Sequence, residues 1–189
     1  MLEPFKSAVD FESGLLKEYD NKVERRLSNL EGIFNDAPSY AQLRAEEDGM
    51  VYEVFEKEVP ANPGQLAHAV TVIYPGKVGA EYYMTKGHFH QKEPTAELYL
   101  GVKGQGGIIM QNKEGKTSYL EMKPGSLVYV APYWAHRTIN IGSEPFSFLA
   151  IYPADAGHDY GTIEKIGFPK LVVEQEGKPT IISNPRFKR

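Results

Sequence analysis

Hydrophobic and polar residues alternate along most of the chain with a period of two, the period of a β-strand that buries one face. β-branched and aromatic residues carry this alternation in the ranges 51–59, 66–75, 96–102, 106–112, 117–122, 126–132, 136–142 and 146–153. Turn sequences such as "PGKVG", "NKEGK" and "GSEP" separate these ranges. Short strands at such close spacing predict an antiparallel β-sandwich or barrel.

A helical period is present in two segments, both near the N-terminus. Residues 36–49 predict a short helix, because Asp36 can cap its first turn, Pro38 fits that turn and Gly49 follows its end. Residues 21–32 space three apolar residues like a helix, but they are equally compatible with an extended arm. Both interpretations of this second segment stay open.

The length of 189 residues suits a single domain with a sizeable core. Its expected parts are an N-terminal extension with the helix (1–50), a barrel core (51–153) and a C-terminal loop with strands (154–189). A net charge of −4 without a basic surplus argues against nucleic acid or an anionic membrane as a partner. The absence of cysteine excludes disulfides, zinc–thiolate sites and cysteine nucleophiles. Because no apolar run approaches about 18 residues and the N-terminus does not resemble an export signal, we expect a cytoplasmic protein.

The stretch "TKGHFHQKEPTAELYL", residues 85–100, carries the most specific chemistry. On a strand, His88 and His90 point to one face and Phe89 points to the other. Such a pair alone is also compatible with an exposed strand face. However, Glu97 opens the next expected strand and His136 opens a later one, so three imidazoles and a carboxylate can meet inside a barrel. This set predicts a site for one divalent transition metal.

These residues also resemble the motifs of the cupin superfamily, an H-x-H pair followed by Glu and Gly, and then Gly, Pro, His and Asn. The matching positions are His88, His90, Glu97, Gly104, Gly125, Pro132, His136 and Asn140. Two features depart from the general motifs: six residues separate His90 from Glu97, and "PYWA" replaces a Pro-x-Gly turn. The resemblance implies an all-β, jelly-roll cupin barrel with one or two short helices, and it says little about the reaction.

Longer segments resemble one family of cupins, the archaeal cupin-type phosphoglucose isomerases. They are "TVIYPGKVG", "VYVAPYWAHRTINIG" and "FLAIYPADAGHDYGTI", and the likeness extends from "RRLSNLEGIF" to "NPRFKR". The resemblance implies reversible isomerisation of glucose 6-phosphate to fructose 6-phosphate, in glycolysis and gluconeogenesis, by a metal-dependent homodimer. It also implies that His88, His90, Glu97 and His136 are the metal ligands, which are the four residues already chosen.

The four ligands suit this reaction. A divalent ion with two open positions can bind the C1 and C2 oxygens of the open-chain sugar and polarise them. Glu97 is the candidate base that moves a proton between C1 and C2, and the alternative is a ligand-only Glu97 with a hydride shift. Three nitrogens and one oxygen fit Fe(II), Mn(II), Ni(II), Co(II) or Zn(II), of which Fe(II) is our first choice.

Phosphate and sugar contacts are expected around the same site. Four residues offer hydroxyls, a charge and backbone amides to an anion, namely Thr71, Thr85, Lys86 and Gly87. Thr71 is also a common strand residue, and Lys86 also suits a solvated surface. His158 is the candidate proton shuttle for ring opening, against a merely stabilising pair with Asp159. Tyrosines that can either face the sugar or pack in the core are Tyr52, Tyr99, Tyr133, Tyr152 and Tyr160.

Other functions would use a similar site. A cupin dioxygenase would hold Fe(II) there and consume O₂, and a non-catalytic sugar-binding cupin would keep the pocket without turnover. Mannose phosphate isomerisation would differ only in its substrate. The "TKG" segment and the loop around His158 favour glucose phosphate. For the homodimer, the first 50 residues are candidates for exchange with a partner or for strand addition to its sheet.

Overall fold

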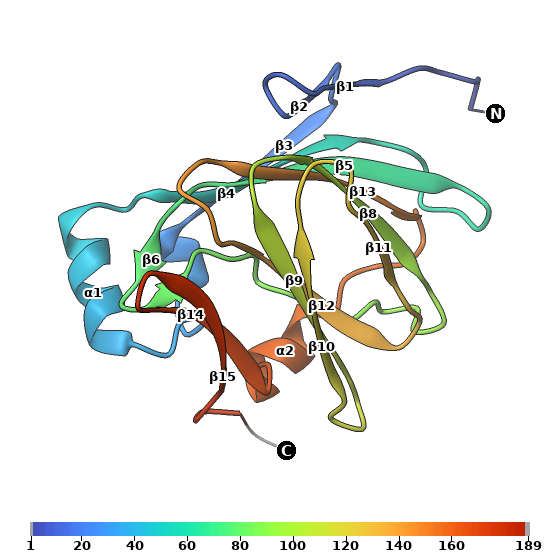
Figure 1. Cartoon of the computed structure of the whole chain (residues 1–189). Coiled ribbons are helices and arrows are strands. Elements are labelled where there is room, and N and C mark those ends of the chain that lie inside the picture. Colours follow the sequence, from blue (N-terminus) through green and yellow to red (C-terminus); the bar gives the residue numbers. More distant parts are fainter. Residues whose placement is uncertain (1, 188–189) are drawn as a thin grey trace.

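The computed structural model describes residues 2–187 and consists mainly of antiparallel strands (Figure 1). The larger sheet has the order β11 (Leu127–Val130), β8 (Glu97–Lys103), β13 (Phe146–Pro153), β5 (Leu66–Ile73), β4 (Met50–Lys57) and β3 (Asn21–Arg26). The smaller sheet has the order β10 (Thr117–Met122), β9 (Gly106–Asn112) and β12 (Trp134–Asn140). Each range predicted from the alternation forms a strand with slightly shifted ends, so the all-β prediction is confirmed.

The core lies between these two sheets. In β13 the alternation buries Phe146, Phe148 and Ala150 on one face. Phe146 reaches the smaller sheet, where a Cβ on Gly106 would lie only 2.1 Å from its ring. Ile108, two residues further along β9, is fully buried in the same cluster. Contact between β13 and β9 therefore closes the barrel.

The N-terminal segment resolves the ambiguity of residues 21–32. The first half is extended as β3, which pairs with β4, and the second half forms a 3₁₀ turn, η1 (Leu27–Leu30). The apparent helical spacing joined two elements, because Val23 faces the barrel from β3 whereas the two leucines are buried by η1. The segment pairs within its own chain at the edge of the larger sheet.

The predicted helix at 36–49 is confirmed as α1 (Ala37–Glu46), which Asp36 caps by accepting a hydrogen bond from Ser39 N at 3.0 Å. Preceding β3, a hairpin of β1 (Ala8–Asp10) and β2 (Leu15–Lys17) covers the outer face of the larger sheet. This hairpin was not predicted, because its strands are only three residues long.

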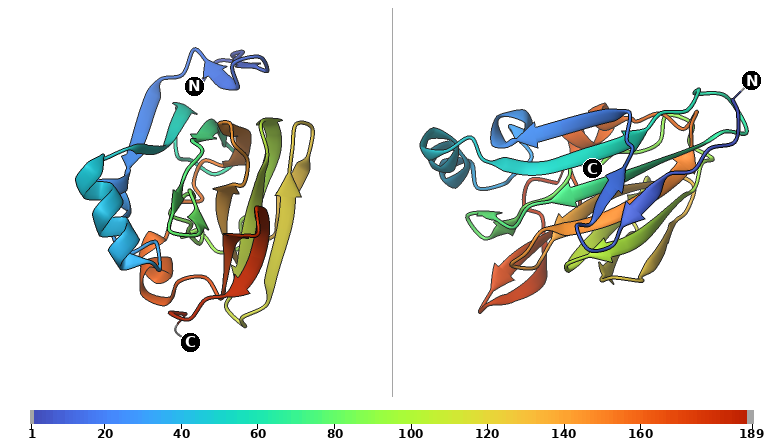
Figure 2. Two further views of the ribbon diagram at one scale, coloured as in Figure 1. Left: turned by 60° about the vertical axis from the view of Figure 1, so that its left-hand side comes forward. Right: turned by 90° about the horizontal axis from the view of Figure 1, so that it is seen from above.

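The C-terminal segment covers the outside of the barrel at the end opposite the β1–β2 hairpin (Figures 1 and 2). Its elements are α2 (Tyr160–Ile166), β14 (Lys170–Gln175) and β15 (Lys178–Ser183), and β14 also pairs with β7 (Glu81–Tyr82), which pairs with β6 (Lys77–Val78). The loop expected around His158 ends at Asp159, because Tyr160 begins α2. No helix within residues 2–187 is long and apolar enough to cross a membrane.

Candidate metal and substrate site

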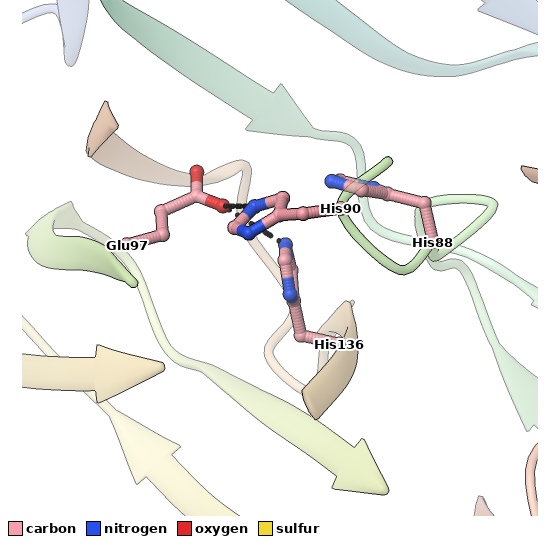
Figure 3. Close-up of side chains that lie close together, drawn as sticks. All are labelled: His88, His90, Glu97 and His136. Atoms are coloured by element: carbon pink, nitrogen blue, oxygen red, sulfur yellow. Dashed lines mark hydrogen bonds and ion pairs between the residues drawn. The ribbon is translucent and has the colours of Figure 1, made fainter. Parts of the chain in front are cut away.

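The four predicted metal ligands converge inside the barrel (Figure 3). The ligand atoms of His88, His90, Glu97 and His136 all lie within 4.8 Å of one another. Two backbone hydrogen bonds, of 3.2 and 3.1 Å, join His88 to His136. Glu97 opens β8 in the larger sheet and His136 lies in β12 of the smaller one, so the cluster connects the two sheets.

The long interval between His90 and Glu97 orients one ligand. His90 Nδ1 lies 3.0 Å from the carbonyl oxygen of Thr95, a buried residue of that interval. This contact turns His90 Nε2 toward Glu97 Oε2, at 3.1 Å. A second bond on the far ring nitrogen is how proteins fix the orientation of a metal-binding imidazole.

The donor set fits a metal ion because it leaves buried nitrogen atoms unsatisfied. His88 Nε2 and both ring nitrogens of His136 are buried without a hydrogen-bond partner among the described residues. His136 Nε2 lies 3.1 Å from Glu97 Oε2, without the alignment of a hydrogen bond. Unpaired buried polar groups are costly in a folded protein, and a divalent ion would satisfy one of these nitrogens on each imidazole.

Charges in the cluster are coupled. Burial alone would raise the pKa of Glu97, but His136 and His90 outweigh burial and hold this pKa at about 2. Burial and the neighbouring imidazoles lower the pKa of His88 well below its ordinary value. Burial would also lower the pKa of His90, but the Glu97 carboxylate outweighs it and raises this pKa. At neutral pH, Glu97 is therefore ionised and His88 is neutral.

A cavity of about 190 Å³ adjoins the cluster, and most predicted site residues line it. They are Tyr52, Thr71, Thr85, Lys86, Gly87, His88, Glu97, Tyr99, His136, Tyr152, His158 and Tyr160. His90 is buried beside Glu97 and does not line the cavity. The structure thus brings three of the four candidate metal ligands and the candidate phosphate-binding residues to one cavity.

Tyr133 is the predicted substrate-binding residue that the structure places outside this lining. Its side chain is 54% exposed, and its φ of 70° is left-handed. This conformation favours glycine, the residue that the general cupin motif has in this turn. The Tyr133 backbone N–H donates to Glu93 O, so the two departures from the general motif contact each other.

The His158 loop is hydrogen-bonded directly to the segment that carries His88 and His90. Asp159 and Phe89 exchange two backbone hydrogen bonds, of 2.8 and 3.2 Å. The Asp159 carboxylate accepts from the backbone and the hydroxyl of Thr162, so it caps α2. The His158 ring instead faces His88, with 4.4 Å between ring centroids. Desolvation of the His158 imidazole lowers its pKa, against the opposing effect of Glu97, and the imidazole is neutral at pH 7.

Two tyrosines form the inner wall of the cavity. Tyr99 is buried and stacks on Phe148 with 4.8 Å between ring centroids. Burial and the Glu97 carboxylate raise the pKa of Tyr99 well above its ordinary value. Burial also raises the pKa of Tyr52 to about 12, against the opposing effects of Arg25 and the backbone N–H of Lys86. Both hydroxyls therefore stay protonated and can donate to a sugar oxygen.

Sequence reasoning missed the wall that β3 contributes. Val23 and Arg25 of this strand line the cavity together with Glu56 of β4. Arg25 pairs in register with Tyr52 across the two strands. A signal was present, because the period-two alternation in the extended interpretation of residues 21–32 puts Val23 and Arg25 on one face.

The barrel, with three histidines and a glutamate inside it that can hold a metal, has the cupin fold. An oxalate oxidase structure shares the fold at a TM-score of 0.50, with 14% identity over 61% of this chain and 58% of that one. A family model described as Glucose-6-phosphate isomerase (GPI) matches residues 24–184. The chain belongs to this glucose-6-phosphate isomerase family and is an enzyme of that class.

Curated relatives with the same description match nearly the whole chain. A glucose-6-phosphate isomerase of Pyrococcus furiosus is 54% identical over 187 residues, which are 99% of this chain and 98% of that protein. One from Pyrococcus horikoshii is 53% identical over 98% of both chains. A putative glucose-6-phosphate isomerase 2 of Rhizobium meliloti is 36% identical over 94% of this chain and 89% of that one.

Proposed function

We propose that the protein interconverts glucose 6-phosphate and fructose 6-phosphate at this cavity, with one divalent transition metal on His88, His90, Glu97 and His136. The observation that carries the proposal is that unpartnered imidazole nitrogens and the Thr85–Gly87 segment belong to one cavity. Fe(II) is the first choice among the ions that this nitrogen and oxygen set accepts. A cytoplasmic location and a role in glycolysis and gluconeogenesis, which the sequence predicts, belong to the same proposal.

When bound, a divalent ion supplies Lewis-acid polarisation of the sugar C1 and C2 oxygens. Glu97 acts as the base that takes a proton from one of these carbons and returns it to the other, and its carboxylate is ionised at neutral pH. His158 is neutral, faces the same cavity, and moves the proton needed for ring opening.

The remaining lining residues bind and orient the substrate. Thr71, Thr85, Lys86 and Gly87 hold the phosphate with hydroxyls, a charge and backbone amides. Tyr52, Tyr99, Tyr152 and Tyr160 contact the sugar hydroxyls. With the phosphate held at one end of the cavity, C1 and C2 are presented to the metal cluster.

The first test is interconversion of the two sugar phosphates by the purified protein, before and after EDTA treatment, with single divalent metals added back. We expect activity to vanish on chelation and to return with a metal. Unchanged activity after verified metal removal would contradict the metal mechanism. If no metal supports isomerisation and the Fe(II) form consumes O₂, the result would point instead to a dioxygenase. Parallel assays with mannose 6-phosphate define the substrate range.

A separate experiment distinguishes proton transfer from a hydride shift. Fructose 6-phosphate is converted in D₂O, and the glucose 6-phosphate formed is analysed by NMR for deuterium at C2. A base such as Glu97 exchanges its proton with solvent, so we expect deuterium there. Product without deuterium, at every extent of conversion, would favour the hydride shift and a Glu97 that is only a ligand.

We also propose that the protein is a homodimer through the outer face of β8 and β11. Cross-strand pairs on this face bring together Leu98 with Tyr129 and Leu100 with Leu127. Leu127 and Tyr129 are 63% and 61% exposed, which is unusual for neighbouring apolar residues. Size-exclusion chromatography with light scattering should give a dimer that Leu127→Glu dissociates, whereas Leu120→Glu on β10 should leave it intact. A monomeric wild type would contradict the proposal.

A further inference from the structure

We propose that Arg137 is a positioning residue that holds the turn Thr85–Lys86–Gly87 in the shape that binds the substrate phosphate. This inference rests on the proposed role of that turn, which we call the TKG turn. Arg137 follows the metal ligand His136 in β12, and the alternation of the strand directs the two side chains to opposite faces. His136 faces the cavity, whereas Arg137 faces the C-terminal segment.

The Arg137 guanidinium makes two hydrogen bonds to one backbone atom of the TKG turn. Its Nε and Nη2 both donate to the carbonyl oxygen of Lys86, at 3.1 and 2.6 Å. The Lys86–Gly87 peptide is trans, because the described chain contains no cis peptide bond. In a trans peptide the C=O and the following N–H point in opposite directions. Holding Lys86 O toward Arg137 therefore directs the Gly87 N–H away from it, on the side of the cavity that Gly87 lines.

Close packing also fixes the turn on its Arg137 side. Gly87 has a left-handed φ of +75°, and a Cβ there would lie 2.8 Å from Phe168 Cε2 and 3.0 Å from Arg137 Cβ. The guanidinium carbon of Arg137 lies 4.7 Å from the centroid of the Phe168 ring. Arg137 and Phe168 thus form a platform on which the turn rests with no space for a side chain.

Burying the charged Arg137 side chain costs desolvation free energy. Arg137 is only 5% exposed, and burial lowers its pKa to about 10, partly offset by the Glu81 carboxylate. The side chain is therefore still cationic at neutral pH. An apolar residue would pack here without this desolvation penalty. The two hydrogen bonds to Lys86 O offset the penalty and explain why a charged side chain occupies the space.

The same region offers a matched control and a route for chemical rescue. Arg137 lines a second cavity of about 360 Å³, between α2 and residues 184–187, and Arg186 lines it too. Arg186 Nη1 donates a hydrogen bond to Phe34 O at 2.9 Å. Arg186 therefore also binds a backbone carbonyl, but one that lies outside the TKG turn. A small guanidinium ion can enter this cavity and occupy the space that Arg137→Ala leaves.

The experiment compares Arg137→Ala and Arg186→Ala, both metal-loaded, with the wild type. Measured quantities are KM and kcat for fructose 6-phosphate, the dissociation constant of inorganic phosphate, and the absorption spectrum of the Co(II) form. For Arg137→Ala we expect KM and the phosphate dissociation constant to rise about 10- to 100-fold, with a smaller change in kcat and an unchanged Co(II) spectrum. Added guanidinium, below denaturing concentrations, should restore phosphate binding in this variant. Arg186→Ala should behave like the wild type.

Wild-type phosphate binding in Arg137→Ala would overturn the inference. So would a fall in kcat with an altered Co(II) spectrum and unchanged KM, because Arg137 would then act through His136. A wild type that isomerises but does not bind inorganic phosphate would overturn the role of the turn alone, whereas a wild type that isomerises no sugar phosphate would overturn the proposed function. If Arg137→Ala does not fold, Arg137→Lys is the test variant. Lysine keeps the charge but cannot donate two hydrogen bonds from one planar group to Lys86 O, so we expect a smaller rise in KM.

Discussion

The protonation states of the four candidate ligands depend on the side chains next to them. Glu97 has the side chain of any surface glutamate, yet two imidazoles within 3.1 Å keep it ionised although it is buried. The same contacts act on His90 in the opposite direction and favour its protonated form. A metal ion and protons therefore compete for one set of atoms.

Glu97→Gln tests the base at this scale. Glutamine keeps an oxygen that can face the metal but cannot accept the substrate proton, so we expect kcat to fall at least about 100-fold. Elemental analysis should still find the metal, and binding of fructose 6-phosphate should change little. Glu56→Gln, which alters another acid that lines the cavity, is the control and should retain most activity. Activity within tenfold of wild type in Glu97→Gln would contradict the proposal that Glu97 is the base.

Metal binding should release a proton near neutral pH. Because the Glu97 carboxylate raises the pKa of His90 above its ordinary value of 6.5, more than half of metal-free His90 is protonated at pH 6.5, and a bound ion would displace that proton. Metal affinity should therefore rise as the pH increases through this range, while Glu97, with a pKa of about 2, releases none. Calorimetry in buffers of different ionisation enthalpy measures the released protons. Heats that do not depend on the buffer at pH 6.5 would show that His90 is already neutral.

Among the elements, α2 and the loop before it show how a short helix supports the site. Asp159 caps α2 with its side chain and joins Phe89 with its backbone, so one residue fixes both the helix and the segment between His88 and His90. His158, the residue before Asp159, lines the cavity. The loop that carries the proposed proton shuttle is therefore fixed at its C-terminal end, where Asp159 precedes α2.

Asp159→Ala should destabilise the protein and weaken catalysis together. Loss of an N-cap costs about 1 kcal/mol of unfolding free energy, which urea denaturation of the metal-free protein can measure. A looser His158 loop should lower kcat as well. Asp159→Asn is the matched variant, because asparagine caps helices nearly as well as aspartate. Equal stability of Asp159→Ala and wild type would show that the cap contributes little here.

In the whole molecule, the four candidate metal ligands connect the two sheets of the barrel. Residues 88–97 and 136 come together only when β8 and β12 are in place, so the unfolded chain offers no comparable site. A bound ion therefore stabilises the folded state by mass action.

Metal removal should lower the thermal stability measurably. With free metal at 1,000 times its dissociation constant, the expected contribution is about 4 kcal/mol. Differential scanning calorimetry of the holo and EDTA-treated protein measures the difference in Tm. His136→Asn should melt at the same temperature with and without metal. A Tm of the wild type that does not respond to metal would contradict an ion held by both sheets.

The sequence by itself determined the strands and the candidate ligand set. Period-two alternation is a local pattern, because it reflects a buried and an exposed face of each strand, as in Phe146 and Phe148. The H-x-H pair, Glu97 and His136 were recognisable because few side chains bind metals. The helix at α1 was predictable from its own N-cap, Asp36.

Only the tertiary structure decided which other residues reach the site. Arg25 joins the cavity because β3 pairs with β4, and Arg137 reaches Lys86 because the chain brings β12 beside the TKG turn. Tyr133 was predicted in the pocket but lies outside its lining, since a left-handed turn sets its direction. Such placements depend on contacts between residues far apart in the sequence, and no local pattern of hydrophobic and polar positions contains them.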